Sequence, residues 1–82
     1  MKQARDIEGM KALGTRLREV RKLKGFSQEK LAFSADLELS QISRIERGII
    51  NTSVSQIFQI SKALQIHPKE LFDFDFDISQ QF

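Results

Sequence analysis

One short segment of the chain carries the side chains best suited to read the base edges of a DNA duplex. On a helix from Leu39 to Arg47, Ile42 and Ile45 point inward, and the residues between them occupy the other faces. Arg44 could donate two hydrogen bonds to guanine O6 and N7, and a serine hydroxyl could bond to several base edges. An arginine on a surface helix is more often simply solvated, so this interpretation depends on the elements that present the helix.

Other residues with reactive or metal-binding side chains are few. The single histidine, His67, precedes Pro68 at a helix start with no nucleophile beside it, which favours a capping or surface role. Asp73, Asp75 and Asp77 are spaced like the ligands of a metal loop, but the intervening phenylalanines and the missing Gly and Glu depart from the calcium pattern. Without cysteine there is no thiolate nucleophile and no thiolate zinc site. We therefore expect no enzyme, no metal site and no cofactor.

The composition fits one small domain with an uneven charge. Domains mostly run to about 100–200 residues, so 82 residues build a single core. The net charge of +2 divides into thirteen bases and seven acids in residues 1–69, and four acids with no base in residues 70–82. A basic body with an acidic tail suits a body that meets a polyanion, although a merely solvated surface is the alternative.

Neither a membrane span nor a secretory signal is recognisable. The longest apolar runs are of two or three residues, far below the roughly 20 that cross a bilayer. The start, MKQARDIEGMK, lacks the apolar region of a signal peptide. We expect a cytoplasmic location and no membrane partner.

Glycines, a proline and capping residues divide the chain into five short helices, within which apolar residues recur every three or four positions. The expected helices run from about Lys11 to Lys24, Gln28 to Ala35, Leu39 to Arg47, from the cap Ser53 through Leu64, and from Pro68 to Phe72. Val54, Ile57, Phe58, Ile60 and Leu64 form the apolar face of the fourth. Residues 73–78 alternate with a period of two, which is a strand pattern. We predict an all-α fold, a compact five-helix bundle: residues 1–12 form an N-terminal extension, 13–72 the domain, and 73–82 a short extended tail rich in Asp and Phe.

A run of residues in the stretch 13–72 follows one known pattern in order and spacing. It comprises Leu17, Val20, Arg21, Gly25, Phe26, Ser27, Gln28, Leu31, Ala32, Leu37, Ile42, Ser43, Ile45, Glu46, Gly48, Ser53, Val54, Ile57, Ala63, Leu64, Ile66, Leu71 and Phe72. In these positions the chain resembles the Cro and lambda-repressor-like (XRE-type) helix-turn-helix family. The resemblance implies a five-helix DNA-binding domain of the phage-repressor type, usually dimeric, whose third helix lies in the major groove.

The resemblance also implies roles for individual residues. Base reading falls to the third helix, through Leu39, Ser40, Ser43 and Arg44, with Gln41 at the margin. Phosphate binding falls to Ser27 and Gln28 at the start of the second helix, and to Arg47 and Asn51 at and beyond the end of the third. Arg21 and Glu46 match a structural pair that links the first helix to the third.

Two positions depart from the family pattern. Asp36 stands where the turn most often has Gly, and Glu38 stands where Ser or Thr commonly caps the third helix. Asp adopts left-handed backbone more readily than most residues, so we expect the turn to form. Glu38 brings negative charge close to the path of the phosphates. We expect its side chain to fold back on the helix N-terminus or to accept a hydrogen bond from cytosine N4.

The leading hypothesis is a sequence-specific transcriptional regulator, such as a repressor, that binds double-stranded operator DNA as a homodimer. We expect the dimer interface on the fifth helix and the tail, through Leu71, Phe72, Phe74, Phe76 and Ile78, and therefore a near-palindromic operator. A frayed terminus is the competing interpretation of the tail. The alternative function is a DNA-binding antitoxin or adaptor whose tail binds a partner protein. The family includes small phage repressors, restriction–modification controllers and antitoxins, among which the sequence does not choose.

Overall fold

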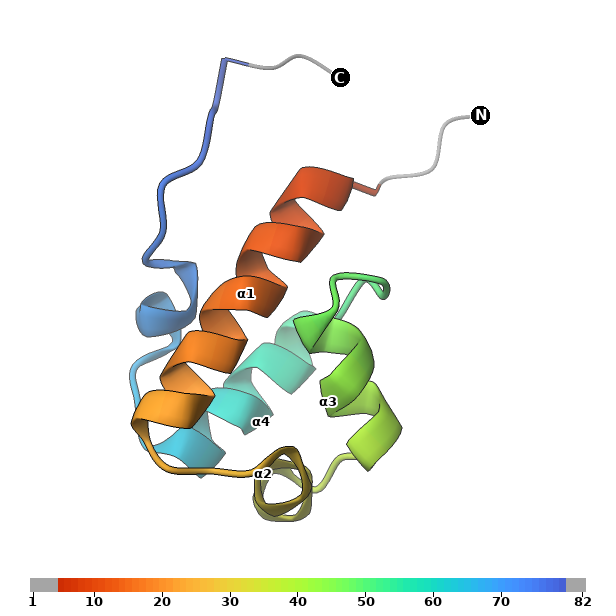
Figure 1. Cartoon of the computed structure of the whole chain (residues 1–82), viewed down its shortest axis with the longest axis vertical. Coiled ribbons are helices and arrows are strands. Elements are labelled where there is room, and N and C mark those ends of the chain that lie inside the picture. Colours follow the sequence, from red (N-terminus) through yellow and green to blue (C-terminus); the bar gives the residue numbers. More distant parts are fainter. Residues whose placement is uncertain (1–4, 80–82) are drawn as a thin grey trace.

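Four α-helices and one 3₁₀ helix make up most of the computed structural model, which describes residues 5–79 (Figure 1). Helix α1 spans Ile7–Leu23, α2 Gln28–Ala35, α3 Leu39–Glu46 and α4 Val54–Leu64, and the 3₁₀ helix η1 spans Pro68–Phe72. The all-α prediction is confirmed for the described range, but the count of five α-helices is not, because the last element is a short 3₁₀ helix. None of the helices between residues 5 and 79 is long and apolar enough to cross a membrane.

Helix α1 begins earlier than the apolar repeat predicts. Its first residue is Ile7 and not a residue near Lys11, so the predicted start of this helix is wrong and residues 7–12 are helical. Asp6 has extended backbone, and its carboxylate accepts a hydrogen bond from the Gly9 amide at 2.9 Å. This bond satisfies one of the amides that a helix start leaves free, and it explains why the helix can begin there.

A tight turn joins α2 to α3. Ser27 caps α2, its hydroxyl accepting a hydrogen bond from the Lys30 amide at 3.0 Å. Asp36 ends α2 with left-handed backbone (φ 58°, ψ 45°), as the turn requires. The amides of Asp36 and Leu37 both bond back to carbonyls of α2, at 3.2 and 2.9 Å. The turn is therefore held by main-chain bonds, and only three residues separate the end of α2 from the start of α3.

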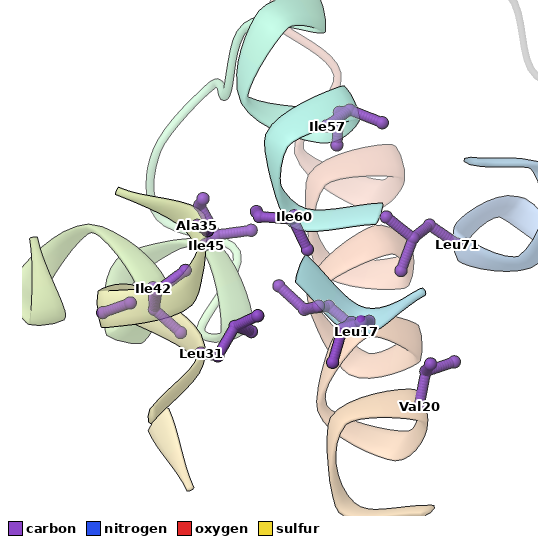
Figure 2. Packing of buried hydrophobic residues seen from close by; sticks show 11 residues of the cluster. Leu17, Val20, Leu31, Ala35, Ile42, Ile45, Ile57, Ile60 and Leu71 are labelled. Carbon is purple, nitrogen blue, oxygen red and sulfur yellow. The ribbon is translucent and has the colours of Figure 1, made fainter. Parts of the chain in front are cut away.

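The core lies where the four helices and η1 meet (Figure 2). Its most deeply buried apolar side chains, all less than 3% exposed, are Leu17, Leu31, Ile42, Ile45, Ile60, Leu64 and Leu71. Two of these, Ile42 and Ile45, come from α3. Their burial fixes the rotation of α3 about its own axis and turns the opposite face of that helix outward.

The apolar face of α4 is wider than the core that covers it. Ile57, Ile60 and Leu64 are buried, as the sequence predicts. Val54 and Phe58 are instead 72% and 48% exposed, so their predicted core positions are wrong. Five apolar residues on one short helix subtend a broad arc, and the neighbouring helices cover only its centre.

The segment after η1 does not form the predicted strand. Residues 73–78 have no regular secondary structure, and nowhere between residues 5 and 79 is there a strand that could pair with them. The rings of Phe72, Phe74 and Phe76 pack in series instead, with centroids 6.5 and 6.2 Å apart. The alternation of apolar and acidic residues therefore places phenylalanine rings at every second position, where they pack on one another within the segment.

Helix α1 holds the beginning of the tail through Arg16. Its Nε donates to the main-chain oxygen of Glu70 at 2.7 Å, and its Nη2 lies 3.7 Å from the Asp73 carboxylate. Further along, the hydroxyl and the amide of Ser79 donate to Asp77 Oδ1 at 2.6 and 2.9 Å, which lowers the pKa of that carboxyl from its ordinary value of 3.8. The tail and α3 lie on opposite sides of α1 (Figure 1).

Candidate nucleic-acid interface

The outer face of α3 presents the residues predicted to read bases. Leu39 is 45% exposed, Ser40 and Arg44 are exposed, and Gln41 and Ser43 are partly buried. Ser40 and Arg44 are four residues apart and therefore share one face of the helix. Among residues 5–79 the Arg44 guanidinium has no hydrogen-bond or ion-pair partner, so its donors are free for a ligand.

A buried ion pair fixes the end of α3 to α1. Arg21 Nε donates to Glu46 Oε2 at 2.5 Å, and Arg21 Nη2 donates to Glu46 Oε1 at 3.1 Å. Both side chains are less than a tenth exposed. The third guanidinium nitrogen, Nη1, donates to the main-chain oxygen of Phe26 at 2.8 Å. Arg21 therefore connects α1, the loop before α2 and the last turn of α3 in one network.

Gln28 belongs to the same network, which the sequence did not indicate. Its Nε2 donates to Glu46 Oε1 at 3.0 Å, and its side chain is partly buried. One side-chain N–H and the main-chain amide remain available to a phosphate. The neighbouring Ser27 accepts from the Lys30 amide, which leaves its hydroxyl hydrogen to donate. Phosphate binding by Ser27 and Gln28 stays a prediction, with donors fixed at the N-terminus of α2.

The two other predicted phosphate ligands lie on the segment that leaves α3. Arg47 is the exposed C-cap residue of α3, and its Nε donates to the Ser43 carbonyl at 3.3 Å. Asn51 is exposed in the loop between α3 and α4. Arg5 also contacts this loop, donating through Nη2 to the Ile49 carbonyl at 3.3 Å. The side-chain donors of Arg47 and Asn51 therefore lie at and just beyond the C-terminal end of α3.

Glu38 does not fold back on α3. It stands at the N-cap position with extended backbone, yet its side chain makes no capping hydrogen bond and is exposed. The first of the two expected contacts of Glu38 is therefore wrong. Its side chain is one methylene longer than that of Asp, and the good caps are Ser, Thr, Asp and Asn. The contact with a base edge remains a prediction.

The residues predicted for a dimer interface are not all at the surface. Leu71 is completely buried and points into the core, so its predicted place in the interface is wrong (Figure 2). The register of η1 turns Leu71 inward and Phe72 outward. Phe72, Phe76 and Ile78 are 53%, 41% and 89% exposed, and Phe74 is partly buried. Four of the five residues therefore remain candidates.

An apolar groove of about 610 Å³ lies beside these aromatic rings. Its walls come from α1, the end of α3, the loop after it, the start of α4 and the tail, and they include Met10, Leu13, Ile45, Ile50, Val54, Ile57, Phe72, Phe74 and Phe76. Val54, at 72%, is the most exposed of these apolar side chains. Helical periodicity missed Val54 as a surface residue because it marks apolar side chains without showing which of them are covered.

The residues considered for metal binding and catalysis have ordinary structural roles or none. His67 is the N-cap of η1, and its Nδ1 accepts a hydrogen bond from the Lys69 amide at 3.1 Å. Within residues 5–79 no three His, Asp or Glu side chains gather in a way that could hold a metal ion.

The paired helices α2 and α3, with α3 turned outward, define a helix-turn-helix protein, and known sequences give the same class. The helix-turn-helix family model matches residues 17–71. The control protein C.BamHI of Bacillus amyloliquefaciens is 52% identical over 62 residues, which cover 74% of this chain and 76% of that protein. The HTH-type transcriptional regulator SlrR of Bacillus subtilis (strain 168) is 39% identical over 62 residues, which cover 74% of this chain but only 41% of SlrR.

Solved structures agree with the sequence matches. The restriction-modification controller protein C.AhdI from Aeromonas hydrophila superposes with a TM-score of 0.76 at 46% identity, over 77% of this chain and 96% of that one. The wild-type restriction-modification controller protein C.Esp1396I gives a TM-score of 0.72 at 28% identity, over 78% and 84%. The chain belongs to the XRE-type helix-turn-helix family, a family of DNA-binding transcriptional regulators and not of enzymes.

Proposed function

We propose that the chain recognises a specific operator through the outer face of α3. The observation that carries this proposal is the exposure of Leu39, Ser40 and Arg44 on a helix whose Ile42 and Ile45 are locked in the core. A helix held in this way presents the same groups to every duplex, as base recognition in the major groove requires. Arg44 reads guanine, Ser40 bonds to a neighbouring base edge, and Leu39 packs on a thymine methyl.

Phosphate contacts on both sides of α3 set its position in the groove. Ser27 and Gln28 bind one backbone through the N-terminus of α2, where main-chain amides already favour an anion. Arg47 and Asn51 bind the backbone beyond the C-terminal end of α3. Glu38, exposed at the start of α3, accepts from a cytosine amino group.

The distribution of charge supports this orientation. Residues 1–69 carry an excess of six positive charges, and residues 70–82 carry four acids without a base. In space residues 73–79 lie across α1 from α3, so this acidic segment is on the side of α1 opposite a duplex bound to α3 (Figure 1). Attraction of the basic body and repulsion of the tail both favour approach through α3.

The regulator acts as a homodimer on a near-palindromic operator. A single short recognition helix touches only a few base pairs, and a second copy about 34 Å away reads the next turn of the duplex. The interface uses Val54, Phe72, Phe76 and the partly buried Phe74 around the apolar groove, together with the exposed Ile78 further along the tail. Aromatic residues around an apolar depression are typical of the centre of a protein interface.

Among small regulators of this family, a restriction–modification controller fits best. Two of the relatives named above, C.BamHI and C.AhdI, are controllers at 52% and 46% identity, and the match covers 96% of C.AhdI. An antitoxin or adaptor that binds a partner protein through its tail is the alternative. The tail rings pack on one another and line a groove of the same chain, which favours a role within the regulator itself.

Selection from a pool of random duplexes at two salt concentrations tests the proposal. The protein should enrich a near-palindrome whose half-sites are about 10 base pairs apart, centre to centre. The enrichment should survive the higher salt, while non-specific binding falls steeply. The Arg44→Ala variant, selected in parallel, should lose its preference at one position of each half-site. Absence of an enriched sequence at either salt concentration would contradict the proposed function.

A further inference from the structure

The main chains of α1 and α3 approach closely at Gly14. This glycine is buried in the middle of α1, where a glycine weakens the helix relative to alanine. A Cβ atom at Gly14 would lie 2.7 Å from the Glu46 carbonyl oxygen and 2.9 Å from the Glu46 carbonyl carbon, and it would be closer still to the Ile45 carbonyl oxygen. All three atoms are main chain and cannot rotate away. The contact therefore requires a residue without a side chain.

A second close approach lies one turn away on the same face of α1. A Cβ atom at Gly48, which has φ +69°, would lie 2.8 Å from Lys11 Cα and 3.0 Å from Lys11 N. Lys11 and Gly14 are three residues apart and so face the same way. Arg21, seven residues after Gly14, holds the Glu46 side chain from that face. The last turn of α3 and the glycine just beyond it thus rest directly on the main chain of α1 at two points, and an ion pair ties α3 to α1 at a third.

We propose that Gly14 is a positioning residue for base recognition, which sets the depth and tilt of α3 against α1. This inference rests on the proposed function. Moving the Glu46 oxygen from 2.7 Å to ordinary contact at 3.4 Å requires at least about 0.7 Å of displacement, and the closer Ile45 oxygen requires more. Hydrogen bonds to base edges form within a window of about 0.5 Å, so such a displacement breaks or weakens them. Contacts to phosphate through long basic side chains tolerate it, since those side chains can follow the backbone.

Gly9 offers a matched control in the same helix. The atoms nearest to a Cβ atom there belong to the side chain of Asp6, at 3.5 Å or more, which is ordinary van der Waals contact. Gly9→Ala and Gly14→Ala make the same chemical change in α1, and both raise the helix propensity of the local sequence. Only the second forces α1 and α3 apart. A difference between the two variants therefore reports the contact with α3.

The test compares binding of the wild-type chain and the two variants to the selected operator and to a random duplex, by fluorescence anisotropy. Far-ultraviolet circular dichroism and thermal unfolding establish that each variant is folded. Gly9→Ala should match the wild type on both duplexes. Gly14→Ala should lose roughly 10- to 100-fold on the operator, the size of one or two base contacts, and less than about threefold on the random duplex. If Gly14→Ala melts too low, the double variant with Gly9→Ala is measured in its place.

Each outcome decides the proposal, separately from the proposed function. A wild-type chain that does not distinguish the operator from the random duplex contradicts the proposed function before any variant is compared. A wild-type chain that distinguishes them, with a Gly14→Ala variant of unchanged preference, overturns the positioning role alone. Equal losses on both duplexes, or a double variant that does not fold, also overturn it, because Gly14 would then serve only the stability of the fold.

Discussion

Removing either partner of the Arg21–Glu46 pair should cost far more than removing an ordinary surface charge. The two side chains are 9% and 3% exposed, so truncating one leaves the other charged and largely cut off from water. Breaking such a pair costs about 3–5 kcal/mol. Glu46 keeps the hydrogen bond from Gln28 when Arg21 is replaced. Arg21→Met should therefore lower the free energy of unfolding by about 3 kcal/mol, the lower end of this range.

A double-mutant cycle isolates the interaction itself. Arg21→Met and Glu46→Leu, measured singly and together by urea unfolding, should show a coupling of at least about 2 kcal/mol, because the double variant leaves no buried charge unpaired. Arg16 and Glu19 provide the control. They form an ion pair of 3.5 Å on the surface of α1, with Glu19 58% exposed, and the same substitutions should couple by no more than about 0.5 kcal/mol. Raising the salt concentration should weaken the control pair more than the buried pair.

Additive losses at Arg21 and Glu46, within about 0.5 kcal/mol, would refute this reasoning. The pair would then contribute no specific link between α1 and α3, and the position of α3 would depend on apolar packing and on main-chain contact alone.

Two further predictions concern the tail and a helix cap. Truncation after Phe72 removes Phe74 and Phe76 from the groove, and the exposed Ile78 with them, so sedimentation should show a dimer for the full chain and a monomer for the shortened one. A dimer that survives the truncation would place the interface on another surface. Ser53 accepts a hydrogen bond from the Gln56 amide at 3.1 Å. Ser53→Ala should therefore lower the free energy of unfolding by about 1 kcal/mol, whereas the exposed Ser55 inside α4 should tolerate the same change, and equal effects would argue against the cap.

The sequence predicted the elements that depend on local patterns. Apolar periodicity and capping residues placed α2, α3 and α4 within a residue or two, because Ser27, Gly48 and Ser53 signal helix ends wherever they occur. The start of α1 was missed although Asp6 is a good N-cap, because the apolar repeat becomes regular only further on. A helix boundary is the least certain part of such a prediction, since one capping bond decides it.

Features that depend on tertiary contacts could not be predicted from the sequence. The alternating tail predicts a strand, but a strand needs a partner, and residues 5–79 contain none. The role of Gln28 depends on a residue eighteen positions away, and that of Gly14 depends on how closely two helices approach. Val54 and Leu71 exchanged their predicted roles, because apolar character does not tell which side chains the core has room to cover.

Comparison of Arg44→Ala with Arg47→Ala on the selected operator and on a random duplex tests most directly whether α3 reads DNA. Arg44→Ala should lose about 1–3 kcal/mol on the operator and little on the random duplex, because it removes a donor to a base edge. Arg47→Ala should weaken binding to both and reduce the dependence of affinity on salt by about one counterion. Equal losses for the two variants on both duplexes would contradict the assignment of Arg44 to a base and Arg47 to the backbone, and with it the central claim that the outer face of α3 carries the sequence specificity.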